Sequence, residues 1–210
     1  MSIDCVKRVV VGISGASGII YGIRLLEKLK EANIETHLVM SESARITLAV
    51  ETALSLDDVH NLANYVYSPK NIGAAISSGS FKTMGMVVAP CSIRSLSEIA
   101  TGITSSLLTR AADVVLKERR RLVLLVRETP LHAGHLRSMM QATENGAIVM
   151  PPVPAFYQKP LTVDDIINHT ICRCLDLFEI NDEHFQRWEG LTVDREKSFQ
   201  KDVAPALSLT

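Results

Sequence analysis

A small set of charged and hydroxyl side chains in this sequence suits proton transfer next to a bound anion. Arg127 and then Glu128 follow the apolar run 122–126, where burial and neighbouring cations can tune the pKa of a carboxylate for acid–base work. Arg110 and Lys117 are seven residues apart and therefore share one face of a predicted helix, from which they can hold one anion together. Tyr157 lies in a proline-rich segment that supports its hydroxyl as a hydrogen-bond donor.

The same cations also have a purely structural interpretation. Asp113 lies three residues after Arg110 and four before Lys117, so it can pair with both and leave only a solvated helix surface. Arg173 flanks the apolar stripe of a later predicted helix, where its charged end can simply extend into water. The spacing alone leaves both interpretations open.

A glycine-rich loop, Gly12-Ile-Ser-Gly15-Ala-Ser17-Gly18, follows the first β-branched run. Glycines let a backbone approach a ligand, and the helix after the loop offers N–H groups and a positive dipole end to phosphate. The spacing differs from G-x-G-x-x-G, and the second predicted strand ends in Met40-Ser41 rather than in an acid that would hold a ribose. The loop predicts a nucleotide or phosphate site and disfavours NAD, and the alternative is a tight turn without a ligand.

Signals for metal or cysteine chemistry are weak. His132 and His135 are one helical turn apart, but no third ligand is evident. Cys172 and Cys174 point in nearly opposite directions on a helix, and no activating base is identifiable for Cys91. The cysteines form no CxxC and suit a reducing compartment. We therefore expect neither a bound metal nor a covalent cysteine mechanism.

Length and composition exclude several classes of protein. The 210 residues favour one large domain with an appended tail. With 22 Lys and Arg against 23 Asp and Glu, the formal charge of −1 gives no net field for nucleic acid or an acidic membrane. Hydrophobic residues make up 47%, enough for a sizeable core, whereas aromatic residues at 5% provide few stacking platforms. The Gly- and Ser-rich stretch 9–23 is too short for a spanning helix and does not fit a signal peptide, so we expect a cytoplasmic protein.

Strand and helix patterns alternate along residues 1–181, which we expect to form the single domain, with 182–210 as a tail. Continuous apolar runs predict strands at 8–13, 34–40, 86–89, 122–126 and 147–150. Helices are predicted at 19–32, 42–54, 95–100, 105–121, 131–145 and 162–180, with a short one from Ser55 and a mostly irregular segment at 64–81. This alternation predicts an α/β fold, a doubly wound parallel sheet with helices on both faces. Ligands bind at the carboxyl ends of such strands, so the loops 14–18, 41, 90–95, 127–130 and 151–157 should line one rim.

Five blocks of the sequence carry a resemblance to a known family. They are Gly15-Ala-Ser17-Gly18, Pro90-Cys-Ser92, Arg110-Ala-Ala-Asp-Val-Val-Leu-Lys117-Glu-Arg, Arg127-Glu128-Thr-Pro-Leu and Pro151-Pro-Val-Pro-Ala-Phe-Tyr157. In this order, over about residues 9–180, they resemble the flavin prenyltransferases, the UbiX-type enzymes that serve UbiD-type decarboxylases of ubiquinone biosynthesis and aromatic-acid breakdown. The resemblance implies a Rossmann-like, flavoprotein-type fold and a metal-independent homododecamer. It also implies that a dimethylallyl group passes from dimethylallyl phosphate to N5 and C6 of reduced FMN, and that the prenylated FMN goes to the decarboxylase.

The resemblance implies roles for individual residues. Catalytic roles fall on Glu128, as the acid/base residue, and on Ser17. The residues that would hold FMN are Gly15, Ala16, Ser17, Ser41, Ser92, Ile93, Arg94, Ser95 and Arg127. Those that would hold the prenyl phosphate are Arg110, Lys117, Tyr157 and Arg173, with Trp188 of the tail closing the site from a neighbouring subunit. Such a cationic cradle would stabilise the leaving phosphate without Mg²⁺.

The sequence departs from the common family pattern at two places, Arg94-Ser95 and His132-Ala-Gly-His135. Two other functions remain open. One is an FMN-dependent cysteine decarboxylase of the pantetheine-precursor type, although this chain has Pro90-Cys-Ser-Ile-Arg where that group carries Asn-containing motifs. The other is a non-catalytic flavin-binding subunit of an aromatic-acid decarboxylase. The decarboxylase served and the choice between a mono- and a diphosphate donor also stay open.

Overall fold

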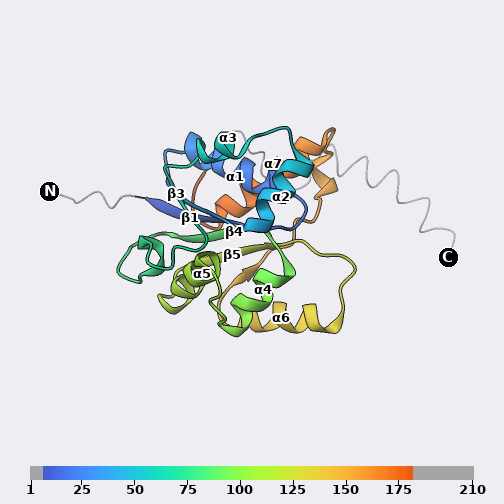
Figure 1. The fold of residues 1–210 in the computed structure, drawn as a ribbon. Coiled ribbons are helices and arrows are strands. Elements are labelled where there is room, and N and C mark those ends of the chain that lie inside the picture. Colours follow the sequence, from blue (N-terminus) through green and yellow to red (C-terminus); the bar gives the residue numbers. More distant parts are fainter. Residues whose placement is uncertain (1–6, 182–210) are drawn as a thin grey trace.

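A parallel sheet between two layers of helices forms the fold, as Figure 1 shows for the computed structural model, which describes residues 7–181. All strand pairs are parallel, and the strand order is β3-β2-β1-β4-β5-β6. The strands are β1 (Arg8–Ile13), β2 (Glu35–Met40), β3 (Tyr65–Tyr67), β4 (Gly85–Cys91), β5 (Arg121–Val126) and β6 (Ile148–Val149). This architecture confirms the predicted doubly wound α/β fold. The expected tail at 182–210, with Trp188, lies outside the described residues.

Helices cover both faces of the sheet (Figure 1). One layer contains α1 (Ile19–Glu31), α2 (Glu42–Glu51), α3 (Leu56–His60) and α7 (Val163–Asp176), and the other contains α4 (Ile93–Thr101), α5 (Leu107–Lys117) and α6 (Ala133–Glu144). Two short 3₁₀ turns, η1 (Ala75–Ser77) and η2 (Phe156–Gln158), lie in loops. Alternate residues of β1 enter different cores, because Val9 and Val11 pack in the α1 layer whereas Val10 packs in the α5 layer. Within residues 7–181, no helix is both long and apolar enough to cross a membrane.

Serine caps fix three helix starts at the carboxyl edge of the sheet. The hydroxyl of Ser41 accepts a hydrogen bond from the N–H of Ala44 at 3.1 Å, at the start of α2. Ser92 and Ser106 cap α4 and α5 in the same way. Each such cap contributes about 1 kcal/mol to the helix that it begins. These caps place the first turns of three helices around the ends of β2 and β4.

The structure corrects three sequence-based boundaries. The segment 64–81, predicted as loop, contains β3, which forms because its backbone pairs with the exposed edge of β2. The helix predicted to reach residue 121 ends at Lys117, because Arg119 adopts a left-handed φ of 55° and Arg121 already begins β5. Strand β4 continues through Pro90 to Cys91, although the sequence predicted the strand to end at residue 89. The carbonyl of Pro90 accepts a hydrogen bond from the Ser14 hydroxyl in the loop after β1.

Candidate functional site

The first and fourth strands end beside each other and feed helices on opposite faces, which is where doubly wound sheets bind ligands. Ser14, which is buried, joins the two loops that follow these strands. Its hydroxyl donates to the carbonyl of Pro90 at 2.7 Å and accepts from the N–H of Ser92 at 2.7 Å. The two loops are therefore held in one fixed arrangement at the carboxyl edge of the sheet.

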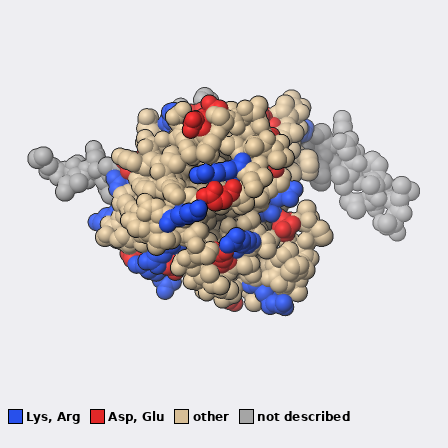
Figure 2. All heavy atoms as spheres, viewed as in Figure 1, with Lys and Arg blue, Asp and Glu red and all other residues tan. Residues whose placement is uncertain are grey.

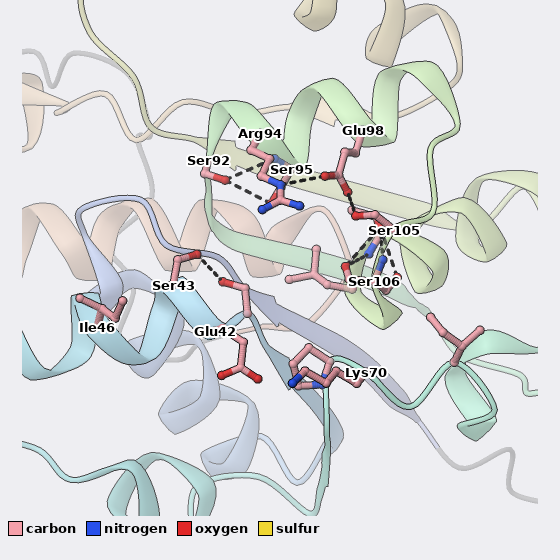
Figure 3. A pocket seen from close by; sticks show the side chains of 15 residues that line it. Glu42, Ser43, Ile46, Lys70, Ser92, Arg94, Ser95, Glu98, Ser105 and Ser106 are labelled. Atoms are coloured by element: carbon pink, nitrogen blue, oxygen red, sulfur yellow. Dashed lines mark hydrogen bonds and ion pairs between the residues drawn. The ribbon is translucent and has the colours of Figure 1, made fainter.

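A cavity of about 740 Å³ opens at this edge (Figure 3). It is lined by Ser41, Glu42, Ser43, Ile46, Pro69, Lys70, Ile72, Ser92, Arg94, Ser95, Glu98, Ser105, Ser106, Leu108 and Thr109. The caps Ser41, Ser92 and Ser106 all belong to this lining, so the positive ends of three helices converge on one space rich in hydroxyl groups. Such a donor set fits the phosphate and polar chain of a nucleotide-like ligand such as FMN. Four residues predicted to hold FMN lie here, namely Ser41, Ser92, Arg94 and Ser95.

Charged side chains lie on two walls of the cavity. On one wall, Glu98 accepts from Arg94 Nε at 2.9 Å and from the Ser105 hydroxyl at 2.5 Å. Burial acts to raise the pKa of Glu98, but the hydrogen bonds from Ser105 and Arg94 and the charge of Arg94 lower it overall. Lys70 and Glu42 also line the cavity, and Figure 3 shows both on the side away from Arg94 and Glu98. In the space-filling view of Figure 2, cations and carboxylates gather around a hollow in this face.

The loop after β1 is bound by a carboxylate that the sequence reasoning missed. Glu51, at the end of α2, accepts from the N–H of Gly18 at 2.9 Å and from that of Ile19 at 3.0 Å. These two N–H groups, which the sequence analysis offered to a phosphate, are bonded to Glu51 in this structure. Burial opposes ionisation of Glu51, but hydrogen bonds from Ser17, Ile19 and Gly18 and the charge of Arg127 lower its pKa overall. Ser17 and Arg127, two predicted site residues, thus both favour the ionised form of Glu51.

Two glycines of the loop after β1 are explained by packing and backbone conformation within the chain. A Cβ on Gly15 would lie 2.3 Å from the hydroxyl oxygen of Ser43, so α2 can approach the loop only because that atom is absent. Gly18 has a φ of +96°, which favours glycine. Since Ser43 also lines the cavity, the β1 loop and the cavity are contiguous. Packing therefore explains Gly15 without a ligand, and Ala16 lies in the same loop.

The proposed acid/base residue follows β5 at the same edge. The N–H of Arg127 donates to the carbonyl of Cys91 at 3.0 Å, which ties the end of β5 to that of β4. Glu128 is exposed, and its Oε1 accepts from the N–H of Thr129 at 2.9 Å. The charge of Arg127 also acts on the pKa of Tyr21, although burial is the larger influence and raises that pKa. Glu128 therefore reaches the rim, outside the lining of the cavity.

Two of the four residues predicted to hold a prenyl phosphate, Arg110 and Lys117, lie on α5. Arg110 pairs with Asp113 at 2.6 Å, as the structural interpretation predicted, but Lys117 pairs with Glu118 at 2.5 Å instead. Lys117 ends α5 just before β5 begins, so it lies at the amino edge of the sheet, opposite the cavity. Arg110 and Lys117 therefore have separate carboxylate partners in this chain, and their joint hold on one anion stays a prediction.

The remaining two predicted phosphate ligands, Tyr157 and Arg173, belong to the proline-rich segment and α7. The Tyr157 hydroxyl lies 3.3 Å from His169 Nε2, and Arg173 pairs with Asp176 at 2.5 Å. His169 is a second residue that the sequence reasoning missed. Burial and, to a smaller degree, the charge of Arg173 lower its pKa, which favours the neutral imidazole.

Within residues 7–181, the structure shows the surroundings of the histidines and of the cysteine that the sequence analysis weighed for metal or covalent chemistry. The described residues contain no group of three or more potential metal ligands. His132 Nδ1 accepts from the N–H of Gly134 at 3.0 Å, and its ring contacts that of His135 at a tilt of 31°, with centroids 3.5 Å apart. Burial raises the pKa of the Cys91 thiol to about 12, so it stays protonated and is a poor nucleophile.

Comparisons with known proteins find close relatives. Residues 4–172 match the family model described as Flavoprotein. The chain is 60% identical over 187 residues to the flavin prenyltransferase UbiX of Escherichia coli strain K12, covering 88% of this chain and 99% of that protein. A crystal structure of AnUbiX in complex with FMN and dimethylallyl pyrophosphate matches with a TM-score of 0.87 and 47% identity, covering 89% of this chain and 99% of that one. A dodecameric FMN-dependent UbiX-like decarboxylase from Escherichia coli O157:H7 matches with a TM-score of 0.85 and 47% identity, covering 88% and 100%.

Proposed function

The chain belongs to the flavoprotein family and, within it, to the UbiX flavin prenyltransferases, and from this premise we propose its reaction. It is a prenyltransferase that joins a dimethylallyl group from dimethylallyl phosphate to N5 and C6 of reduced FMN. The product, prenylated FMN, then serves a UbiD-type aromatic-acid decarboxylase. The observation that carries this proposal is the hydroxyl-lined cavity at the strand ends, where three helix N-termini converge at the same edge of the sheet as the loops that carry Ser17, Arg127 and Glu128.

We assign the flavin to the cavity and the adjoining β1 loop. Ser41, Ser92 and Ser95, together with Ile93 and Arg94 of α4, offer hydroxyl, N–H and guanidinium donors there. Gly15 and Ala16 belong to the loop that continues the cavity past Ser43. Reduced flavin supplies the nucleophilic atoms when it is bound. The protein's part is to hold the flavin and to exclude water.

We assign stabilisation of the leaving phosphate to residues of α5, α7 and the proline-rich segment, and proton transfer to residues at the rim. Phosphate departure from an allylic carbon develops negative charge, which Arg110, Lys117 and Arg173 and the Tyr157 hydroxyl would stabilise. Glu128 would take and return a proton at the flavin, since it projects from the end of β5 without a charged partner among the described residues. Ser17 would assist next to it, held by Glu51.

The assembly and location complete the proposal. The copies form a homo-oligomer of the dodecameric kind described for the relative from Escherichia coli O157:H7. Residues 1–181 act as one domain, and the tail, with Trp188, closes a site of a neighbouring copy. Cytoplasmic location is supported by Cys91 and Cys174, which are buried thiols suited to a reducing compartment.

An anaerobic assay tests this function. Purified protein is mixed with reduced FMN and dimethylallyl phosphate, and the flavin is extracted and weighed by mass spectrometry. We expect a flavin heavier by one C₅H₈ unit, and inorganic phosphate released in equal amount. Unchanged FMN after long incubation, with the donor intact, would contradict the proposal.

Two further arms of the assay separate the alternatives. Dimethylallyl diphosphate replaces the monophosphate in one, because AnUbiX was crystallised with the pyrophosphate. The monophosphate should react faster, since this chain shows no acidic cluster for a metal that a diphosphate would require, within the residues described. A cysteinyl pantetheine precursor replaces the prenyl donor in the other arm. Its decarboxylation would instead favour a cysteine decarboxylase.

A further inference from the structure

The cavity contains a cation that no residue role assigned so far uses, the ammonium group of Lys70. Lys70 lies in the loop between β3 and η1 and faces the cavity from the wall opposite Arg94 (Figure 3). The loop is firmly placed, because the carbonyl of the buried residue Pro69 accepts from the N–H of Leu107 at 2.8 Å. Lys70 is therefore anchored to the start of α5, one of the three helices whose N-termini meet at the cavity.

The other charged side chains that line the cavity already have ion-pair partners. Arg94 is paired with Glu98 at 2.9 Å, and Glu98 also holds the Ser105 hydroxyl. Glu42, which also lines the cavity, has an ion pair with Arg45 at 3.6 Å. Within residues 7–181, no ion pair joins Lys70 to a carboxylate. Lys70 is thus the cation of this cavity whose charge is left for a ligand.

A phosphate monoester is the ligand group that this arrangement suits. Hydroxyl groups and helix N-termini supply neutral donors and partial positive charge, which favour an anion but do not match a full double charge. A lysine ammonium is a compact point charge that binds phosphate without demanding a planar partner. We propose that Lys70 is a further binding residue for FMN, donating to the flavin's phosphate from the β3–η1 loop. This inference rests on the proposed function, since it takes FMN as the ligand.

Comparing FMN with riboflavin isolates the phosphate, because riboflavin is the same molecule without it. Binding of both flavins to the full chain is measured by flavin fluorescence for the wild type, Lys70→Gln and Lys70→Arg. Lys70→Gln should weaken FMN binding about ten-fold, as for loss of one charged hydrogen bond, and leave riboflavin binding within about two-fold of wild type. Lys70→Arg should restore most of the FMN affinity, and added KCl should weaken FMN binding less in Lys70→Gln than in wild type.

Lys82→Gln is the matched control, because Lys82 is an exposed lysine of the same long connection that does not line the cavity. It should leave the affinity for both flavins unchanged. Equal weakening of FMN and riboflavin by Lys70→Gln, or no weakening of either, would overturn the role of Lys70. A wild-type protein that binds neither flavin would instead refute the proposed function, and the Lys70 inference with it.

Discussion

Two carboxylates at the carboxyl edge of the sheet have contrasting surroundings that suit different tasks. Glu51 is fixed by the N–H groups of Gly18 and Ile19, and its lowered pKa keeps it ionised at neutral pH. Glu128 is exposed and bonded locally to the N–H of Thr129. A carboxylate that must exchange a proton needs an exposed position such as that of Glu128. A carboxylate that holds a loop in place needs fixed N–H donors, as Glu51 has.

The Glu128→Gln variant separates binding from turnover. The amide keeps the size of the side chain but cannot transfer a proton, so single-turnover prenylation of reduced FMN should slow by about 100-fold or more. FMN affinity, measured by fluorescence, should change little because Glu128 does not line the cavity. Prenylation at the wild-type rate would show that the proton is carried elsewhere, and a large loss of FMN affinity would show a binding role instead.

Sequence reasoning found residues by their neighbours along the chain and missed those whose partners are distant. Glu51 offered one signal, since an acid in the last turn of a helix is unfavourable to the helix dipole and suggests another role. Its partners at Gly18 and Ile19 depend on how α2 packs against the β1 loop, which no local pattern reports. The rim loops after β2, β4 and β5 were predictable because they follow from strand patterns alone.

At the scale of elements, the β3 edge of the sheet contains a hydrogen-bonded network around the buried residue His37. His37 of β2 is 2% exposed, and its Nε2 lies 2.8 Å from Glu35 Oε1. Because a carboxylate only accepts, Nε2 carries the proton, and Nδ1 of the neutral ring accepts from the Tyr67 hydroxyl at 2.9 Å. Glu35 also pairs with Arg8 at 2.9 Å, so the network joins β1, β2 and β3.

This network predicts that acid weakens the fold. Burial lowers the pKa of His37 below its ordinary value of 6.5; the bond and charge of Glu35 oppose this, and the charge of Arg8 adds to it. As pH falls below 6.5, the unfolded chain therefore takes up a proton that folded His37 resists, and stability decreases by at most about 1.4 kcal/mol per pH unit. Urea unfolding of wild type and His37→Gln between about pH 5 and 7 measures it. The free energy of unfolding of His37→Gln should fall less steeply with decreasing pH than that of the wild type. Equal pH slopes for the two proteins would contradict the assignment to His37.

The same network explains which elements the sequence did not reveal. The strand β3 has only three residues with an exposed or half-exposed pattern, so its alternation carries no signal. It exists because β2 offers an unpaired edge and because Tyr65 and Tyr67 stack on His37. The long strands and amphipathic helices were predictable, since each buries an apolar face whose residues recur at a regular spacing along the sequence.

At the scale of the whole molecule, the residues assigned to the prenyl-phosphate site lie on different elements of one chain, namely α5, η2 and α7. Lys117 lies at the amino edge of the sheet, whereas the cavity lies at the carboxyl edge. Apolar side chains remain exposed on α2, at Ile46 and Val50, and around Tyr157, at Phe156 and Leu161. Exposed apolar surface of this kind marks contacts between proteins. We therefore expect neighbouring copies to cover it and to bring Lys117 of one copy to Tyr157 of another.

Hybrid oligomers test this arrangement directly. Lys117→Met and Tyr157→Phe should each lose most prenylation activity, because each removes a donor to the leaving phosphate. If the two residues of one site come from different copies, then mixing the variants, after dissociation and reassembly, restores intact sites. Random assembly of equal amounts gives an intact Lys117 and an intact Tyr157 at about one half of the positions each, and hence about a quarter of the wild-type activity. Each variant reassembled alone is the control and should stay inactive. Mixed oligomers that remain as inactive as their parents would show that both residues of a site belong to one chain, which would contradict the separation seen between the two edges of the sheet.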